Sequence, residues 1–429
     1  MEPARTFVII GAGQAGAWVA KTLRGEGFTD RIILVGAEAH TPYERPPLSK
    51  GLLSGTCDVA SAMLLTQDQM IELDVHHWPS TKATRIDRKT REIYTDDGRS
   101  FRYDCLFVTT GSRPRLLDLP EGSEAHGRTH VLRTLDDAAR LREALAGSTR
   151  LAVIGGGWIG LEVAATARQL GLEVTVIEGA PRLCSRSVPS EISDYLAHLH
   201  RSQGIEILTN RPVDKIEVTA DEVSIKLGNQ REVFDHVVIG VGIIPETDLA
   251  AAAGLQVDNG ILVDECGRTS DPAIFAAGDV THHPSPFVGG RIRLESWANA
   301  QNQAIVAAKA ALGHDVRYDE IPWIWSDQFD RNIQIIGAPD RAVSLYVRGN
   351  PWNEAGCWLA LDDRGVAIGA VAVNAPRDLR FVKKALQERA TPDIAQWMSG
   401  DVAVAKVEFV PNVSRHEPRT SARLAGRLQ

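Results

Sequence analysis

Cysteines are few and scattered in this chain. The 429 residues contain five of them, with no CxxC pair and no histidines at metal-ligand spacing: Cys57, Cys105, Cys184, Cys266 and Cys357. This pattern argues against a disulfide framework and predicts isolated thiols in a reducing cytoplasm, without a bound metal. No apolar run approaches the roughly 18 to 20 residues of a membrane helix. A strand expected from Thr6 leaves no space before it for a secretion signal, so we expect a soluble, cytoplasmic protein.

Positive charge is also in short supply. Lysine and arginine number 47 against 55 acidic residues, which gives a formal net charge of −8 and a pI near 5.9. Proteins that bind nucleic acid usually carry a strongly basic face, so we expect no nucleic-acid partner. The length fits two to four domains at about 100 to 200 residues each.

A pattern of strand, glycine turn, helix and strand occurs twice. The first copy is strand 6–10, turn 11–16 (GAGQAG) and strand 31–35, and the second is strand 151–154, turn 155–160 (GGGWIG) and strand 173–177. Such a repeat predicts parallel nucleotide-binding units of the Rossmann type. A second pair of apolar stretches, 103–108 and 234–239, closes each copy without polar alternation, as expected for strands covered on both faces. The fold class is therefore α/β.

Each glycine turn predicts a nucleotide site. The first glycine makes a tight bend, the second lets the backbone approach a pyrophosphate, and the third allows close helix packing, with the phosphates at the helix N-terminus. The expected contacts are Gly11, Gly13, Ala15 and Gly16 in the first unit, and Gly155, Gly157, Trp158, Ile159, Gly160 and the later Gly242 in the second.

An acidic residue about 20 positions beyond the glycines is expected to bind a ribose hydroxyl. Glu178 stands in that place in the second unit and would repel a 2′-phosphate, which favours NADH, although Arg182 and Arg186 nearby leave NADPH open. In the first unit Glu38 comes slightly late. It is either a ribose ligand or a solvated surface acid.

Three further stretches carry a family resemblance: residues 43–50 (YERPPLSK), 269–280 (TSDPAIFAAGDV) and 325–330 (WSDQFD). With both glycine turns, they make residues 5–410 resemble the FAD-dependent, NADH-oxidising ferredoxin reductases. That family includes putidaredoxin reductase and the reductase components of Rieske-type dioxygenases. The third stretch separates it from other flavin disulfide-reductase relatives. Where those relatives carry redox cysteines after the first glycine turn, this chain has RPPLSK, so the flavin itself must pass on the electrons.

The resemblance implies a glutathione-reductase-like architecture. Residues 1–112 and 243–320 would form a discontinuous FAD-binding domain, and 113–242 an inserted NAD-binding domain. A change to short alternating strands and tryptophans marks a C-terminal α+β domain at 321–410. The arginine-rich end, 411–429, lacks apolar periodicity and is expected to be a flexible tail.

The resemblance also implies roles for single residues. Those expected to line FAD, beside Glu38, are Arg45, Lys50, Ala83 through its backbone, Arg133, Asp279 and Trp297. The expected catalytic residues are Lys50, as a cation beside the flavin, Glu162, as its partner near the nicotinamide, and Trp325, between the flavin and the electron acceptor. Without the resemblance, Lys50 and Glu162 would be surface charges, Asp279 a turn-capping side chain and Trp158 a core residue.

The expected activity is NADH:ferredoxin oxidoreductase, with FAD and NADH as cofactors and a [2Fe–2S] ferredoxin as the partner that feeds an oxygenase. Two alternatives remain at this point. One is an NADH oxidase or quinone-type reductase, and the other is a nucleotide-responsive interaction protein similar to apoptosis-inducing factor. A monomer and a homodimer are both compatible with the sequence.

Overall fold

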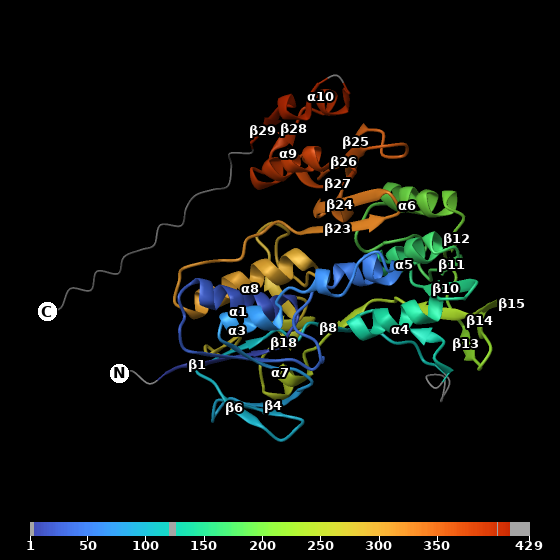
Figure 1. Ribbon diagram of the computed structural model, residues 1–429. Coiled ribbons are helices and arrows are strands. Elements are labelled where there is room, and N and C mark those ends of the chain that lie inside the picture. Colours follow the sequence, from blue (N-terminus) through green and yellow to red (C-terminus); the bar gives the residue numbers. More distant parts are fainter. Residues whose placement is uncertain (1–3, 120–125, 401, 412–429) are drawn as a thin grey trace.

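The computed structural model describes residues 4–119, 126–400 and 402–411. Nearly all of the predicted tail, 411–429, lies outside them. Figure 1 shows three units: the first glycine-turn unit in blue, with chain returning in yellow and orange, the second in green, and the C-terminal unit in orange and red. In the part of the chain that is described, no helix is both long enough and apolar enough to cross a membrane.

The first unit contains a five-stranded parallel sheet of order β20-β7-β1-β2-β3. Its strands are β1 (Thr6–Ile10), β2 (Arg31–Val35), β3 (Val75–Trp78), β7 (Cys105–Val108) and β20 (Ile274–Ala276). Alternate residues of β1 enter different cores. Phe7 and Ile9 pack with α1 (Gln14–Gly25) and α8 (Trp297–Ala311), whereas Val8 and Ile10 pack against an antiparallel layer of β4 (Ala83–Asp87), β5 (Glu92–Thr95) and β6 (Ser100–Arg102). Both faces are therefore covered, which explains the apolar strands.

The second unit repeats this plan. Its five-stranded sheet has the order β12-β11-β10-β16-β9, formed by β9 (Thr129–His130), β10 (Arg150–Ile154), β11 (Glu173–Ile177), β12 (Glu206–Leu208) and β16 (His236–Ile239). One face is covered by α4 (Leu135–Leu145), α5 (Trp158–Gln169) and α6 (Ser190–Ser202), and the other by β13 (Lys215–Val218), β14 (Val223–Leu227) and β15 (Gln230–Phe234). Antiparallel β8 (Ser112–Pro114) and β17 (Ile243–Pro245) pair where the chain enters and leaves this unit.

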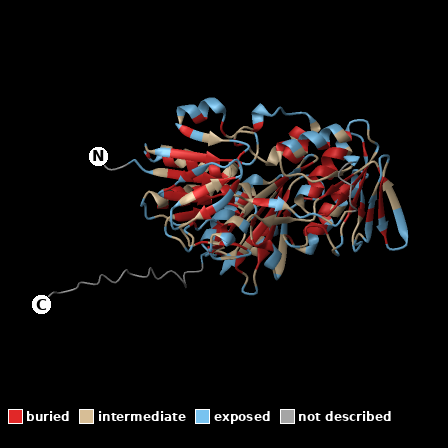
Figure 2. Cartoon of the chain, turned by 90° about the horizontal axis from the view of Figure 1, so that it is seen from below, coloured by how far each residue is buried: buried red, intermediate tan, exposed pale blue. Residues whose placement is uncertain are grey.

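Short elements complete the first unit. They are η1 (Pro46–Ser49), α2 (Gly51–Ser54), η2 (Ala60–Ala62), α3 (Gln67–Glu72), α7 (Asp248–Ala252) and a small sheet of β18 (Val257–Asp258), β19 (Gly260–Leu262), β21 (Thr281–Pro284) and β22 (Arg291–Ile292). Figure 2 shows that buried residues concentrate on the strands and on the helix faces turned toward them.

The C-terminal unit is an antiparallel sheet of order β23-β24-β27-β26-β25. Its elements are β23 (Trp323–Gln328), β24 (Arg331–Gly337), η4 (Pro339–Arg341), β25 (Ser344–Gly349), β26 (Gly356–Leu361), β27 (Ala367–Val373), α9 (Pro376–Gln387), β28 (Thr391–Pro392), α10 (Ile394–Met398), η5 (Val404–Lys406) and β29 (Phe409–Val410). One face packs on α9, and the other packs on the second unit. Strands followed by helices make this unit α+β.

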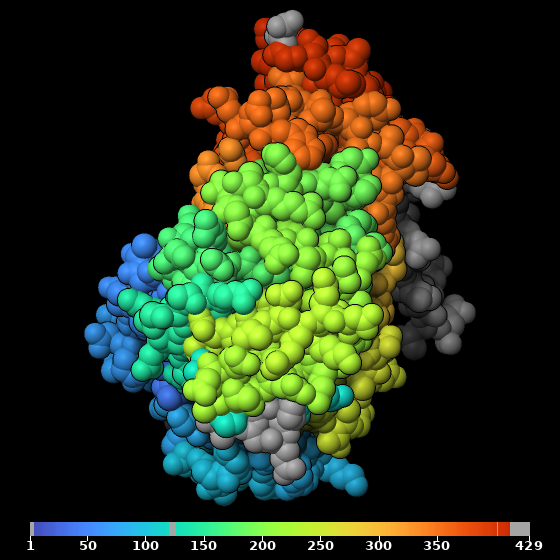
Figure 3. Space-filling view, turned by 90° about the vertical axis from the view of Figure 1, so that its right-hand side faces the viewer, coloured from blue at the N-terminus to red at the C-terminus, as the bar shows by residue number. Residues whose placement is uncertain are grey.

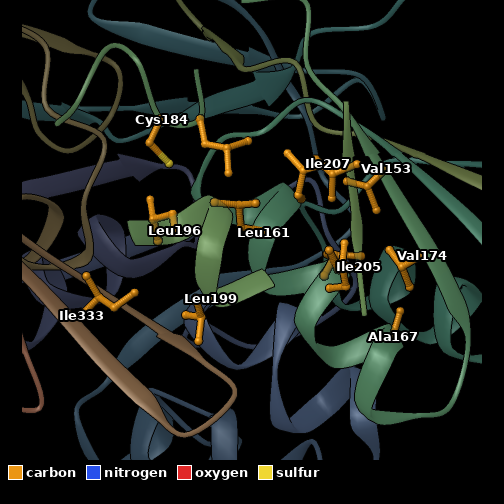
Figure 4. Close-up of a cluster of buried hydrophobic side chains, with 14 of the residues drawn as sticks. Val153, Leu161, Ala167, Val174, Cys184, Leu196, Leu199, Ile205, Ile207 and Ile333 are labelled. Carbon is orange, nitrogen blue, oxygen red and sulfur yellow. The ribbon is translucent and has the colours of Figure 1, made fainter. Parts of the chain in front are cut away.

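The second and C-terminal units share one hydrophobic core. Figure 4 shows Ile333 of β24 beside Leu196 and Leu199 of α6. The same cluster continues through Leu161 of α5 into the sheet of the second unit. In Figure 3 the orange and red C-terminal unit sits directly on the green second unit. This contact fixes the position of β23, which carries a tryptophan of the site.

Candidate active site

One cleft joins the two glycine turns. It has a volume of about 850 Å³ and is lined by residues 11–15 of the first turn and 155–160 of the second. Lys50, Glu162 and Trp325 line it as well, and so do Trp297 and Asp279. This volume lies in the range of cofactor sites, about 300 to 1,000 Å³. The cleft therefore collects side chains from all three units.

The first and third glycines of both turns are required by steric fit. Gly11 and Gly155 both have a φ of +108°, and a Cβ on either would lie 2.3 Å from a carbonyl oxygen of the neighbouring strand end. A Cβ on Gly16 or Gly160 would lie 2.0 or 2.1 Å from the carbonyl oxygen of the first glycine of its own turn. The two turns are thus built alike, and no larger residue fits these positions.

The middle glycines leave space for a ligand instead. Gly13 and Gly157 are the N-caps of α1 and α5, and neither helix has a side-chain cap. A Cβ on either glycine would meet nothing within 4 Å, and both residues face the cleft. Amide groups at a helix N-terminus bind anions. The two turns therefore fit the pyrophosphates of two dinucleotides, and these residues would hold FAD and NADH.

Two partly buried arginines extend the site next to the first turn. Arg133 donates from Nη2 to Asp279 Oδ2 at 3.0 Å, and Ser112 donates to the same oxygen at 3.1 Å. Burial, together with the nearby Arg45, lowers the pKa of Arg133. Arg45 pairs with Glu38 at 2.8 Å and donates to the carbonyl oxygen of Arg133. Arg133 Nε is buried and has no partner among the described residues, which leaves a donor for an acceptor on a ligand.

The two acidic residues predicted to bind ribose are held differently. Glu178 directly follows β11 and accepts from the amides of Gly156 and Ala180, at 2.7 Å each. The equivalent position after β2 is Gly36, because Ile10 pairs with Val35 as Ile154 pairs with Ile177. Glu38 lies two residues later and is engaged by Arg45 and by the Tyr43 hydroxyl. Both acids line the cleft.

A buried ion pair lies between the two turns. Lys50 Nζ is 2.7 Å from Glu162 Oε2, and the side chains of the pair are 21% and 3% exposed. Ser49 donates to the same oxygen, and Ser326 of β23 donates to Oε1 at 2.6 Å. Lys50 and Ser49 belong to the first unit, Glu162 lies on α5, and Ser326 comes from the C-terminal unit. The pair is thus assembled by all three units.

Tryptophans form the wall on the side of the C-terminal unit. Trp325 meets Trp297 edge-on, with ring centroids 5.7 Å apart, and stacks on Trp323 at 5.2 Å. Trp323 faces the C-terminal core and donates to Gln334. Trp158 lines the cleft and packs against the shared core, while its buried Nε1 has no partner within residues 4–119, 126–400 and 402–411. Trp158 therefore combines the two environments that the sequence left open.

Most residues predicted for the site line the cleft, but two do not. Ala83 is buried on β4, and Gly16 lies behind the turn against Gly11. Ser49, Ser326 and Tyr43 were not predicted to hold the charged groups. Ser49 and Ser326 stand inside quoted motifs, but their spacing gives no sign that both face Glu162. Cys184 is the cysteine that lines the cleft, and burial raises the pKa of its thiol.

Comparisons with known proteins agree with this geometry. Residues 5–304 match the family described as pyridine nucleotide-disulphide oxidoreductase, and residues 323–407 match the domain described as reductase C-terminal. The chain is 40% identical to the ferredoxin–NAD(+) reductase component of an anthranilate 1,2-dioxygenase system from Burkholderia cepacia, over 91% of this chain and 96% of that protein. The chain belongs to the ferredoxin–NAD(+) reductase family.

Other members of the family are similar over almost their whole length. The reductase component of the p-cumate 2,3-dioxygenase system of Pseudomonas putida is 38% identical over 91% of this chain and 96% of that protein. The solved putidaredoxin reductase–putidaredoxin complex matches with a TM-score of 0.90 and 35% identity, covering 94% of this chain and 97% of that chain. The predicted fold class is confirmed by these matches.

Proposed function

We propose that this chain is an NADH:ferredoxin oxidoreductase that holds FAD at the first glycine turn and NADH at the second. Its electrons would pass to a [2Fe–2S] ferredoxin that supplies an oxygenase. The observation that carries the proposal is the single cleft lined by both turns, with the Lys50–Glu162 pair between them and Trp325 on the wall. Relatives that span the chain's full architecture are ferredoxin–NAD(+) reductase components.

A bound FAD would supply the redox chemistry, which is hydride uptake from NADH and the release of single electrons. The residues of the protein would bind the two cofactors and orient them. The N-termini of α1 and α5 would bind the pyrophosphates, and Asp279 holds the Arg133 guanidinium beside the first turn. Glu178, which accepts from backbone amides at the second turn, would bind the ribose of NADH.

Lys50 supplies the positive charge of the centre. A fixed cation stabilises negative charge that develops during a reaction, and such electrostatic terms are often the largest in catalysis. Glu162 fixes this cation, because its carboxylate is buried and pairs with Nζ at 2.7 Å. Ser49 and Ser326 hold the carboxylate in turn.

Trp325 is proposed to lie between the cofactor and the ferredoxin. It lines the cleft and is partly exposed, and the C-terminal unit places it against Trp297. We place the protein in the cytoplasm, where its five free cysteines remain reduced.

Stopped-flow absorbance tests the proposal with purified holoprotein. NADH should reduce the flavin rapidly, and the reduced protein should pass electrons to a [2Fe–2S] ferredoxin faster than to oxygen or a quinone. Faster oxidation by oxygen or a quinone would favour the alternative reductase. A slow reaction that leaves a long-lived charge-transfer complex would favour a nucleotide-responsive interaction protein.

A further inference from the structure

A buried hydrogen-bond chain leads from the ion pair to the second unit. Ser326 donates to Glu162, Gln328 Nε2 donates to Ser326 Oγ at 3.0 Å, and Gln328 Oε1 lies 2.8 Å from His200 Nε2. The exposed fractions are 3% for Glu162, 1% for Ser326 and Gln328, and 0% for His200. This series of hydrogen bonds therefore runs from α5 through β23 to α6 among buried side chains.

The chemistry of these groups fixes the direction of every bond. A carboxylate paired with a lysine only accepts hydrogen bonds, so the Ser326 hydroxyl must donate its single hydrogen to Glu162. Ser326 then accepts from the amide nitrogen of Gln328. The remaining amide oxygen accepts from His200, so His200 carries its proton on Nε2. Each bond therefore points its positive end toward Glu162.

The environment of His200 agrees with this tautomer. Its Nδ1 is buried and has no partner in the described part of the chain, and burial lowers the pKa of His200 to about 4. A second proton on Nδ1 would have no acceptor. The other titratable groups around Glu162 are Lys50, its ion-pair partner, and Cys184, whose thiol pKa is raised by burial. Lys50 is therefore the charge that balances Glu162.

We propose that Ser326, Gln328 and His200 are positioning residues that hold the Glu162 carboxylate fixed against Lys50, and so keep the bound flavin at a lower reduction potential. The proposal rests on the proposed function, because it assumes that this ion pair lies beside FAD. A negative charge near the flavin disfavours the addition of electrons. A lower potential in turn strengthens the driving force toward ferredoxin.

The test is the midpoint potential of the bound flavin in purified holoprotein variants. Ser326→Ala leaves Glu162 Oε1 without its donor, so the carboxylate is no longer fixed against Lys50, the cation is less well neutralised and the flavin potential rises. For Ser326→Ala we expect a tenfold change in the equilibrium constant for reduction of the flavin, which is about 30 mV for a two-electron couple. Gln328→Leu and His200→Leu should raise the potential by successively smaller amounts. Ser326→Thr and His200→Gln keep the donors and should retain the potential of the wild type.

A matched control is Ser224→Ala. It removes a buried hydroxyl of β14 that takes no part in the hydrogen bonds of Ser326, Gln328 and His200. Its potential should stay unchanged. Infrared difference spectra give a second measurement, because Ser326→Ala should shift the stretching bands of a carboxylate, and these bands should be lost on adding Glu162→Gln. Kinetically, electron delivery to ferredoxin should slow, because a reduced flavin of higher potential is a weaker reductant.

The two proposals fail in different ways. If the wild type does not reduce a ferredoxin but the graded potentials appear, the function is wrong and the hydrogen-bond chain stands. If the wild type reduces ferredoxin and Ser326→Ala keeps both the potential and the infrared spectrum of the wild type, the positioning role is wrong. Should Ser326→Ala not retain flavin, Gln328→Leu and His200→Leu decide the question by the same criteria.

Discussion

Acid should destabilise the folded protein through His200, and one substitution isolates this effect. His200 is fully buried, and burial lowers its pKa from 6.5 to about 4. Between these values the unfolded chain binds a proton at this residue and the folded chain does not. The stabilisation from a neutral His200 is therefore complete above about pH 6.5 and is lost as the pH falls toward 4. At about pH 5 the linkage relation gives a loss of roughly 2 kcal/mol from this residue, against almost none at about pH 7.5.

His200→Gln cannot titrate, and its amide can still donate to Gln328. The wild type should therefore lose about 2 kcal/mol more unfolding free energy than this variant between about pH 7.5 and 5. Urea unfolding followed by tryptophan fluorescence measures both proteins at both pH values. His130 and His283, whose pKa values burial also lowers to about 4, contribute equally to the two proteins and cancel. Equal losses in wild type and variant would refute the assignment of a neutral, buried His200.

Three further predictions concern the cofactors and the partner. Asp279→Ala leaves the partly buried Arg133 and the buried Ser112 without their shared acceptor and should weaken FAD retention by about 2 to 4 kcal/mol; unchanged flavin affinity in an absorbance titration would contradict this. The wild type should prefer NADH to NADPH, and Glu178→Ala should narrow the ratio of kcat/KM values by the roughly 1.5 to 3 kcal/mol of a charge-assisted hydrogen bond; equal use of both by the wild type would count against Glu178. Trp325→Ala should leave stopped-flow flavin reduction by NADH intact and slow electron delivery to ferredoxin; equal impairment of both steps would make Trp325 a packing residue.

The parts of the fold that the sequence predicts well depend on local sterics. The glycine turns are one example, because a positive φ at Gly11 and close approach at Gly16 tolerate no side chain. The apolar strands beside them are another, since covered parallel strands need apolar residues on both faces. Lys50, Glu162 and Asp279 meet in one cleft because the units that carry them dock around these turns. Their roles, like the domain boundaries, remain predictions.

What the sequence could not predict depends on contacts between distant segments. Ser49, Ser326 and His200 belong to one polar cluster, yet 113 residues separate Ser49 from Glu162, and 164 separate Ser326 from it. Glu38 shows a limit of spacing rules. Its late position was visible, but its engagement by Arg45 and Tyr43 depends on how residues 43–50 fold back onto the strand end.

The position of Ser326 gives the C-terminal unit a function inside the site. Removing a buried carboxylate from water is costly unless hydrogen bonds and an opposite charge replace the water. Lys50 and Ser49 satisfy one oxygen of Glu162, and Ser326 satisfies the other. A chain that lacked β23 would leave Oε1 unsatisfied, even with both glycine turns intact. The shared core that packs Ile333 against α6 therefore also completes the ion pair. Docking of the C-terminal unit onto the second unit brings in the donor that stabilises the Glu162 carboxylate in the cleft.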